Sequence, residues 1–466
     1  MVMQIYNSQS KQKEVFKPIH APKVGIYVCG ITVYDYCHIG HARVMVAFDM
    51  IVRHLRSRGY DVKYVRNITD IDDKIIARAI ANNESIQSLT ERFITAMHED
   101  EAALNVLRPD IEPKATEYIT QITDMIQILV DKGFAYLAPN HDVYFRVAKF
   151  ADYGKLSGKK IEDLHSGARV DINEQKESPF DFVLWKASKP SEPHWHSPWG
   201  EGRPGWHIEC SAMSKHTIGE QLDIHGGGHD LQFPHHENEI AQSECAHGHT
   251  YVNTWMHVGF VNVDNEKMSK SLGNFFTIRD VLKHYPAEVI RFFLLSSHYR
   301  NPLNYTTENL DNARAALRRL YGALEGVALV APDTRLLAQW TDTYNAVMDD
   351  DFNTPQAFAV LFDLATEVNK AKAAKNSDLA GQLSQVLVSL ANQLGVLTSE
   401  PSAFLQGGAS ADGLSEADIQ AKIEARVAAK KAKDFAAADA IRNELKAAGI
   451  EILDTAHGTT WRRKEI

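Results

Sequence analysis

The stretch Cys29-Gly-Ile-Thr-Val-Tyr-Asp-Tyr-Cys-His-Ile-Gly-His41 decides how the rest of this chain is interpreted. A short apolar run, Val24-Gly-Ile-Tyr-Val28, precedes it and predicts a buried strand. From Ala42 to Arg58 apolar residues recur at helical spacing, which predicts a helix that ends near Gly59. The stretch is therefore the turn between a strand and a helix, where free backbone amides and the positive end of the helix dipole favour a phosphate.

His38 and His41 in this turn flank Gly40, which lets a flat ligand approach the backbone closely. The letters His-Ile-Gly-His are equally compatible with a polar helix start that has no function. A second motif, Lys267-Met-Ser-Lys-Ser271, favours the functional interpretation because its two lysines can hold a polyphosphate in a transition state. It lies between a predicted strand and the turn at Gly273-Asn274. In this order the two motifs resemble the paired signatures of the class I aminoacyl-tRNA synthetases.

Strands and helices alternate between Gly25 and about Leu107. The strand Asp61-Val-Lys-Tyr-Val-Arg66 leads into Asn67-Ile-Thr-Asp-Ile-Asp-Asp-Lys-Ile75 and then into a helix. This alternation predicts an α/β fold with a parallel, Rossmann-like sheet that binds ligands at the carboxyl ends of its strands. The acidic run Asp70, Asp72 and Asp73 falls at such an end, where helix capping is an equally good explanation.

The composition is that of an ordinary globular chain with several domains. Of the 466 residues, 44% are hydrophobic and 24% are charged. No apolar run approaches the roughly 18 residues of a membrane span, and the polar segment 1–17 lacks a signal core, which predicts a cytoplasmic protein. Four cysteines cannot form a disulfide framework. The net charge of -10 argues against a protein that coats nucleic acid, although one local basic face suffices to bind RNA.

The pattern changes several times along the chain, which predicts inserted and appended domains. After about Pro113 a helix, short strands and a polar stretch predict an insertion between two halves of the sheet domain. Beyond Thr277 the chain is almost wholly helical, and Glu400 to Leu414 has the composition of a linker. The expected boundaries are 1–112 and 205–276 for the two halves of the catalytic domain, 113–204 for the connective insertion, 277–310 for a linking helical region, 311–398 for a helical bundle, 399–414 for the linker and 415–466 for a small α/β domain.

Four residues far apart in the sequence form a candidate metal site. Cys29 and Cys210 each lie at the end of a predicted buried strand. His235 and Glu239 are four apart at the start of a predicted helix and so share one face. Two thiolates, an imidazole and a carboxylate are a competent tetrahedral zinc set. Their spacing is not that of a local zinc finger, so inert buried cysteines and a capping or core histidine are the alternatives.

Longer stretches of sequence indicate a particular family within the class I synthetases. The chain is similar to the cysteinyl-tRNA synthetases in Cys29-Gly-Ile-Thr-Val-Tyr, Asn67-Ile-Thr-Asp-Ile-Asp-Asp-Lys, Gly205-Trp-His-Ile-Glu-Cys-Ser-Ala-Met, His225-Gly-Gly-Gly-His-Asp-Leu-Gln-Phe-Pro-His-His-Glu-Asn-Glu, Met348-Asp-Asp-Asp-Phe-Asn-Thr-Pro355 and Gly458-Thr-Thr-Trp-Arg-Arg463. The similarity covers essentially the whole chain, with no departure at the motif positions. It implies one zinc ion per chain, held by Cys29, Cys210, His235 and Glu239, and no such role for Cys37, Cys245 or His236.

The resemblance also implies the reaction and the remaining site residues. The implied enzyme is a monomeric cysteine–tRNA ligase that activates L-cysteine with ATP, accompanied by Mg2+, and transfers it to the 3′ end of tRNA(Cys). Around ATP it places His38 and His41 at the phosphates, Gly40 at the adenine, Asp230 at the ribose hydroxyls, and Lys267 and Lys270 at the departing pyrophosphate. Around the amino acid it places Thr69, Trp206 and His225. Core packing explains Trp206 equally well.

The helical region resembles the anticodon-binding bundle of this subgroup, and the last residues resemble its small terminal domain. Trp461, Arg462 and Arg463 suit stacking on and pairing with splayed anticodon bases. The lysines at 430, 431 and 433 suit backbone contacts. A solvated terminus and a solvated helix face are the alternatives for these two groups.

Two other functions remain open. A related ligase family joins cysteine to an amino sugar with the same zinc and nucleotide motifs, but it lacks a long helical C-terminal region such as this chain has. A non-catalytic RNA-binding protein could retain zinc for structure alone. Against it stand both histidines of the first signature and both lysines of the second, which are intact.

Overall fold

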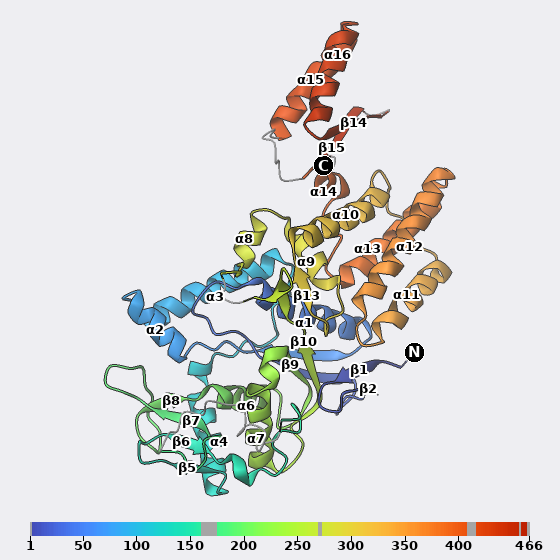
Figure 1. Cartoon of the computed structure of the whole chain (residues 1–466). Coiled ribbons are helices and arrows are strands. Elements are labelled where there is room, and N and C mark those ends of the chain that lie inside the picture. The colour runs from blue at the N-terminus through green and yellow to red at the C-terminus, as the bar shows by residue number, and fades with distance from the viewer. Residues whose placement is uncertain (1, 160–174, 269–272, 408–415, 456–457, 464–466) are drawn as a thin grey trace. The chain divides into compact units, whose positions relative to one another are not determined.

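The computed structural model of the chain describes residues 2–159, 175–268, 273–407, 416–455 and 458–463. The chain divides into two compact units (Figure 1). The first comprises residues 1–280, 294–306 and 345–357, and the second comprises residues 281–293, 307–344 and 358–466. The first unit contains the parallel sheet, and the second is mainly helical.

A four-stranded parallel sheet organises the first unit. Its strands are β3 (Lys23–Val28), β4 (Asp61–Arg66), β9 (Leu222–Gly228) and β10 (Val252–Val258), in the order β10-β9-β3-β4. Helix α1 (Ile39–Ser57) connects β3 to β4, and α7 (His235–His247) connects β9 to β10. The strand order reverses between β3 and β9, and ligands of such sheets bind outside the carboxyl ends at that point. The expected α/β fold with a parallel sheet is confirmed.

Burial explains why β3 and α1 form where the sequence predicts them. In β3 the side chains of Ile26, Tyr27 and Val28 alternate between the two faces of the sheet and are all buried, because helices cover both faces of a parallel sheet. In α1 the apolar positions, which recur every three or four residues, are buried against the sheet. The helix ends at Ser57, and Gly59 follows with a φ of 87°.

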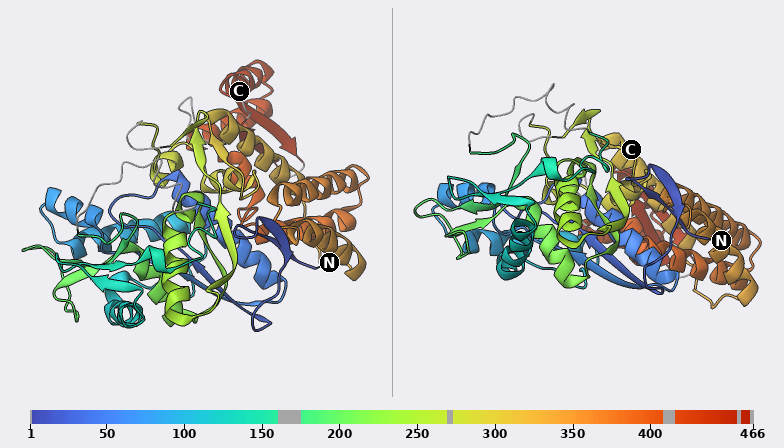
Figure 2. Two further views of the ribbon diagram at one scale, coloured as in Figure 1. Left: turned by 60° about the horizontal axis from the view of Figure 1, so that its bottom comes forward. Right: turned by 90° about the horizontal axis from the view of Figure 1, so that it is seen from below.

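An antiparallel sheet is inserted between β4 and β9. It consists of β5 (Ala135–Leu137), β6 (Val143–Phe145), β7 (Phe182–Ala187) and β8 (Gly202–Pro204), paired in that order. Helix α4 (Ile119–Asp131) packs with α6 (Trp206–Thr217) and α7, and these two helices lie side by side in Figure 2. The buried ring of Trp185 belongs to the hydrophobic core of this region.

The other elements of the first unit are short or lie at its margins. The segment before β3 forms a hairpin of two strands, β1 (Gln4–Asn7) and β2 (Gln12–Val15). After β4 and β10 come α2 (Asp73–Ala81), α3 (Ile86–Ala103), β11 (Val261–Val263), β12 (Glu266–Lys267) and β13 (Leu303–Tyr305). Helices α8 (Ile278–Leu282) and α9 (Ala287–Leu295) begin in one unit and end in the other.

The expectation that Cys210 ends a strand is wrong. Cys210 lies within α6, which begins after Gly205. This helix is buried on nearly all sides, so its sequence lacks the alternation of apolar and polar residues that identifies a surface helix. A short apolar run without that alternation cannot be distinguished from a buried strand by pattern alone.

The second unit consists of helices followed by a small α/β domain. The helices are α10 (Thr307–Leu324), α11 (Thr334–Met348), α12 (Thr354–Ala373), α13 (Ser377–Gln393) and α14 (Pro401–Gln406), of which α11 ends and α12 begins in residues of the first unit. The small domain consists of α15 (Glu416–Lys431), α16 (Phe435–Ala447) and the hairpin of β14 (Ile450–Thr455) and β15 (Gly458–Arg463). None of the helices in the described ranges is long and apolar enough to cross a membrane.

Trp461 does not lie where base stacking requires it. Its ring is 6% exposed and packs with Ile419, Ile423, Leu445 and Ile450 in the core of the small domain. The small domain has few other large apolar side chains with which to build a core, so the tryptophan fills it. The expectation that Trp461 stacks on RNA is therefore wrong for this structure.

Candidate active site and metal centre

A cavity of about 420 Å³ opens at the carboxyl ends of β3 and β9. Cys29 and Gly30, which directly follow β3, line it together with Gly228 and Asp230 at the end of β9. Its size is that of a site for a small ligand. The cavity thus lies at the reversal of strand order, as expected for a sheet of this type.

The first signature lines this cavity, but its backbone amides are not free. His38 is the N-cap of α1, and its Nδ1 accepts from the amides of Gly40 and His41 at 3.0 and 3.3 Å. In the reverse direction, Nδ1 of His41 accepts a hydrogen bond from the amide of His38 at 3.2 Å. The two rings stack 3.6 Å apart. The signature therefore presents two fixed imidazoles rather than the free amides that the sequence suggested.

The second signature begins at the end of β12, and the segment that follows it lies beside the first signature. Lys267 ends β12, and Lys270 lies outside the described residues. The chain after the signature pairs with the first one: the amide of Ile39 donates to Phe276 O at 3.1 Å, and the amide of Ile278 donates to Cys37 O at 2.9 Å. The two signatures are thus neighbours at the same cavity.

A side chain at Gly40 would collide with its surroundings. A Cβ there would lie 2.9 Å from the ring of His38 and 3.3 Å from Cε of Met268. The ring of His38 and the side chain of Met268 therefore take up the space beside this glycine, and the expected approach of a flat ligand stays a prediction.

The residues expected around the amino acid divide into one exposed and two buried side chains. Trp206 lines the cavity, is 40% exposed and stacks on His235 with ring centres 4.2 Å apart, so it is not a core residue. Thr69 is buried, and its hydroxyl donates to Oε2 of Glu209 at 3.3 Å. His225 is also buried, with Nε2 2.6 Å from Oε2 of Glu239.

The four expected metal ligands converge at the base of this cavity. One donor atom from each of Cys29, Cys210, His235 and Glu239 lies within 4.8 Å of the other three, and all four side chains are buried. The two Sγ atoms are 3.6 Å apart, and Oε1 of Glu239 lies 3.3 Å from Sγ of Cys29. Two soft sulfur donors with one nitrogen and one oxygen suit zinc.

His235 has the orientation of a ligand. Its Nδ1 lies 2.9 Å from Nδ1 of His207, and its Nε2 lies 3.0 Å from Oε1 of Glu239. Although that second distance is short, Nε2 has no aligned hydrogen-bond partner among the described residues. A buried ring nitrogen directed at two sulfur donors and a carboxylate, with its other nitrogen held by a neighbour, has the arrangement of a metal-ligating histidine.

The protonation of the cluster supports the same interpretation. Burial opposes the thiolate of Cys210, but the thiol of Cys29 and the ring of His235 together lower the pKa of Cys210 to about 6. Burial likewise opposes the carboxylate of Glu239, but His225 and His235 hold its pKa well below the usual range. Although burial opposes it, Cys210 and Glu239 in turn raise the pKa of His235 to about 9, and burial with Cys210 raises the pKa of Cys29 well above its usual value. A metal ion held by these four side chains would displace the protons of Cys29 and His235.

Sequence reasoning missed two side chains at this centre, His236 and Tyr251. His236 lies 3.2 Å from Sγ of Cys29 through Nε2. With Cys29, His225 and Glu239 it forms a second set of donors within 4.8 Å of one another. Tyr251 donates to Oε2 of Glu239 at 3.0 Å. The adjacent pair His235-His236 was the one signal available, because neighbouring residues at the start of a buried helix can both face the same centre.

Another cluster, His98, Glu101 and Glu112, has the spacing of a metal site but a different composition. Arg66 pairs with both carboxylates, and Arg108 pairs with Glu112 at 2.9 Å. Arginine compensates the charge there, so this cluster is a structural ion-pair network.

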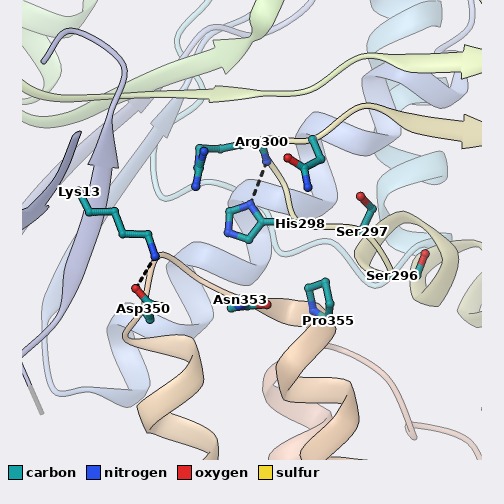
Figure 3. A pocket seen from close by; sticks show the side chains of 9 residues that line it. Lys13, Ser296, Ser297, His298, Arg300, Asp350, Asn353 and Pro355 are labelled. Atoms are coloured by element: carbon teal, nitrogen blue, oxygen red, sulfur yellow. Dashed lines mark hydrogen bonds and ion pairs between the residues drawn. The ribbon is translucent and has the colours of Figure 1, made fainter. Parts of the chain in front are cut away.

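A separate cavity of about 510 Å³ lies away from the signatures (Figure 3). Lys13 and Asp350, which line it, form an ion pair of 2.6 Å (Figure 3). Arg300, which also lines it, donates to Asp351 at 2.7 Å. Because both cations are paired and none of the expected site residues lines it, this cavity is not the candidate active site.

The fold and the site define a class I aminoacyl-tRNA synthetase, and comparisons with known proteins agree. The family model for the tRNA synthetases class I (C) catalytic domain matches residues 15–315, and the DALR domain model matches residues 343–398. Among solved structures, Mycobacterium tuberculosis methionyl-tRNA synthetase in complex with methionyl-adenylate is similar with a TM-score of 0.57 and 15% identity, covering 82% of this chain and 91% of that one. At this identity the likeness concerns the fold alone.

Two curated relatives are similar over almost the whole length. A cysteine–tRNA ligase of Hydrogenovibrio crunogenus is 62% identical, covering 99% of this chain and 100% of the relative. A cysteine–tRNA ligase of Chromohalobacter salexigens is 60% identical, covering 98% and 99%. The chain belongs to the cysteine–tRNA ligase family of class I aminoacyl-tRNA synthetases.

Proposed function

We propose that this chain activates L-cysteine with ATP and transfers it to the 3′ end of tRNA(Cys). The observation that carries the proposal is that Cys29 belongs both to the buried donor cluster and to the wall of the cavity. A substrate thiol bound in the cavity would then lie beside the cluster. In the first step the cysteine carboxylate attacks the α-phosphate of ATP, which gives cysteinyl-adenylate and pyrophosphate. In the second, a terminal ribose hydroxyl of the tRNA attacks the adenylate carbonyl.

We assign one zinc ion to Cys29, Cys210, His235 and Glu239. The alternative set replaces Cys210 and His235 with His225 and His236, and so offers one thiolate instead of two. In that set Nε2 of His225 lies 2.6 Å from Oε2 of Glu239, and Nε2 of His236 lies 3.2 Å from Sγ of Cys29. The low pKa of Cys210 supports the first set, because a metal-ligating thiol must lose its proton.

Zinc in this position would address a problem of selectivity. Cysteine and serine differ by one atom, and a pocket that recognised shape alone would distinguish them by only about 1–3 kcal/mol. Bound zinc would offer a strong coordination position to a thiolate and a poor one to a hydroxyl. Trp206, which lines the cavity and stacks on His235, supports a role as a wall of the amino-acid pocket. Thr69 and His225 are buried, which supports a role in positioning Glu209 and Glu239.

For ATP we propose the roles that the family resemblance implies. His38 and His41 contact the phosphates, Gly40 the adenine and Asp230 the ribose, and all four residues line the cavity. The stacked imidazoles are held by backbone bonds, so they meet the phosphates without reorganising. Lys267 and Lys270 stabilise the departing pyrophosphate, with Mg2+ accompanying the nucleotide.

For the tRNA we propose that the helices of residues 311–398 and the small domain of residues 415–466 bind the anticodon arm. The match of residues 343–398 to the DALR domain supports this assignment for the bundle. It also distinguishes the chain from the ligase that uses an amino sugar, which has no such region. The monomeric state and the cytoplasmic location stay predictions.

The decisive experiment is cysteine-dependent ATP–pyrophosphate exchange, with serine as the control substrate and a zinc assay of the same preparation. We expect exchange with cysteine, none with serine, and one zinc per chain. Charging of tRNA(Cys) by the same enzyme completes the test. Exchange without transfer to tRNA would instead identify the amino-sugar ligase, and bound zinc without exchange would identify a non-catalytic protein.

A further inference from the structure

The cavity extends beyond the residues assigned to ATP. Asp230 and Gly259 follow β9 and β10, whereas Lys74 lies on α2, which follows β4 at the opposite edge of the sheet. Tyr34 and Tyr36, from the turn after β3, line the cavity on the same side as Lys74. We call Tyr34, Tyr36 and Lys74 the lip of the cavity.

Exposed aromatic rings are rare in the part of the chain that the structure describes. Three of them are more than a third exposed: Phe435 at 64%, Tyr36 at 42% and Trp206 at 40%. Two of these three line this one cavity. Trp206 belongs to the proposed amino-acid pocket, which leaves Tyr36 without an assigned ligand. An exposed aromatic ring at the mouth of a cavity offers a flat face on which part of a ligand can stack.

The ring of Tyr36 is held in place from two sides. The edge of Phe93 on α3 meets it with ring centres 5.2 Å apart and planes at 84°. The guanidinium of Arg279 lies 5.1 Å from its centre. Arg279 is itself fixed by Glu99 at 2.5 Å and by Asp100 at 3.1 Å. Tyr36 is thus a rigid platform, and ordering it on binding would cost little entropy.

Lys74 gives the lip a positive charge. Its Nζ lies 5.8 Å from the ring of Tyr34, and no carboxylate of the described residues lies within ion-pair distance of it. The neighbouring Asp73 is engaged elsewhere, with Lys186 at 2.8 Å and Arg203 at 2.5 Å. In a chain with a net charge of -10, an unpaired lysine at the mouth of a cavity suits an anionic ligand.

We propose that the lip binds the single-stranded 3′ end of the tRNA, with a base stacked on Tyr36 and a phosphate at Lys74. An aromatic platform beside a cation is the combination by which proteins bind single-stranded nucleic acid without reading its sequence. The proposal rests on the proposed function and names residues that would bring the acceptor end to the adenylate. Tyr36 and Lys74 then serve the transfer step and not the activation step.

The first test compares charging of tRNA with ATP–pyrophosphate exchange, which requires no tRNA. In Tyr36→Ala and Tyr36→Leu we expect the ratio of charging efficiency to exchange efficiency to fall roughly ten-fold or more, as expected for the loss of one stacked base. Tyr36→Phe keeps the ring and should restore the ratio. Ile80→Ala, at a side chain 74% exposed on α2, is the matched control for loss of a surface apolar group.

The second test uses salt, because a lysine that meets a phosphate releases counterions. In Lys74→Gln we expect the slope of log KM for tRNA against log salt to become shallower by about 0.7, the value for one phosphate contact to a single strand. Lys149→Gln, at an exposed lysine of the inserted region, should leave the slope as in the parent enzyme.

The outcomes distinguish a failure of the proposed function from a failure of the proposed tRNA site. Exchange that is absent in the parent enzyme refutes the proposed function. Exchange that is present, with an unchanged ratio in Tyr36→Ala and an unchanged salt slope in Lys74→Gln, refutes the lip as a tRNA site. A rise in KM for ATP or cysteine in the exchange reaction, equal to the loss in charging, would assign the lip to the small substrates and also overturn the proposal.

Discussion

The hydroxyl of Tyr251 provides a sharp test of the metal assignment. It lies outside the proposed ligands and donates to Oε2 of Glu239 at 3.0 Å, on the carboxylate oxygen that faces away from Cys29. Tyr251→Phe removes this hydroxyl and keeps the buried ring. Partners that hydrogen-bond to a ligating carboxylate orient it and set its donor strength. We therefore expect the substitution to weaken metal binding without removing a ligand.

The structure sets the size of this effect. One hydrogen bond to a charged group is lost, which corresponds to about 1.5–3 kcal/mol. His225 remains 2.6 Å from the same oxygen, so Glu239 keeps one donor there and the lower part of the range applies. At 1.4 kcal/mol per factor of ten, zinc affinity should fall roughly ten-fold and at most about one hundred-fold.

Competition between the protein and a coloured zinc chelator, followed by titration, measures this affinity. Tyr344→Phe is a matched control, because Tyr344 is also buried and its hydroxyl has no hydrogen-bond partner among the described residues. Ser214→Ala removes the other partner of Tyr251, 2.7 Å from its hydroxyl, and spares Glu239. If Tyr251→Phe bound zinc as tightly as both controls, Glu239 would not be a ligand tuned by Tyr251, and the assignment would be refuted.

Three further predictions concern stability. The buried guanidinium of Arg43 donates to the backbone carbonyls of Leu294, His298 and Asn301. Because Arg43→Met leaves these acceptors without their donor, it should lower the free energy of unfolding, measured in urea, by about 3 kcal/mol or more. Burial and the nearby histidines lower the pKa of His257 to about 3. Between this value and the ordinary pKa of histidine, the ring is protonated in the unfolded chain and neutral in the folded protein. Stability should therefore fall by about 2 kcal/mol as the pH drops from 6.5 to 5, and less in His257→Gln, as the denaturant midpoint will show. Trp461→Ala should lower the free energy of unfolding of the small domain by about 3–5 kcal/mol and make that domain sensitive to protease. If the small domain of the variant resisted protease as well as that of the parent protein, the place of Trp461 in its core would be contradicted.

Local pattern was sufficient for the parts of the site that depend on neighbouring residues. The turn from β3 into α1 was predictable, because strand, turn and helix each have their own spacing. The pairing of His235 with Glu239 was predictable from four-residue spacing on one helix. The approach of Cys29 to Cys210 was not, because these residues are 181 positions apart and meet only through packing of α6 against the sheet. Residue chemistry made the two cysteines candidate ligands, with inert buried cysteines as the alternative, and the family resemblance implied that they share one ion.

The errors have physical causes that are specific to their positions. The sequence around Cys210 predicts a strand because a helix that is buried on all sides lacks the alternation of apolar and polar residues typical of a surface helix. The amides at Gly40 and His41 were expected to be free because N-caps are usually serine, threonine, aspartate or asparagine, whereas a histidine caps this helix. Trp461 was assigned to RNA because an aromatic residue beside arginines has the composition of an RNA contact. Composition cannot tell whether a ring faces solvent or fills a small core.

The charge of the proposed metal centre explains the polar side chains that surround it. With a metal bound, Cys29 and Cys210 would be thiolates and, with the Glu239 carboxylate, would place three negative charges where all four ligands are buried, and burial of uncompensated charge is prohibitive. A divalent cation would offset two of them, and His225 and Tyr251 would stabilise the third by bonding to Oε2 of Glu239. Hydrogen bonds that stabilise a carboxylate also reduce the charge that it offers a metal. On this assignment Glu239 is the weakest of the four donors, so the bonds that make its burial tolerable also make it the donor with which a substrate thiolate can compete.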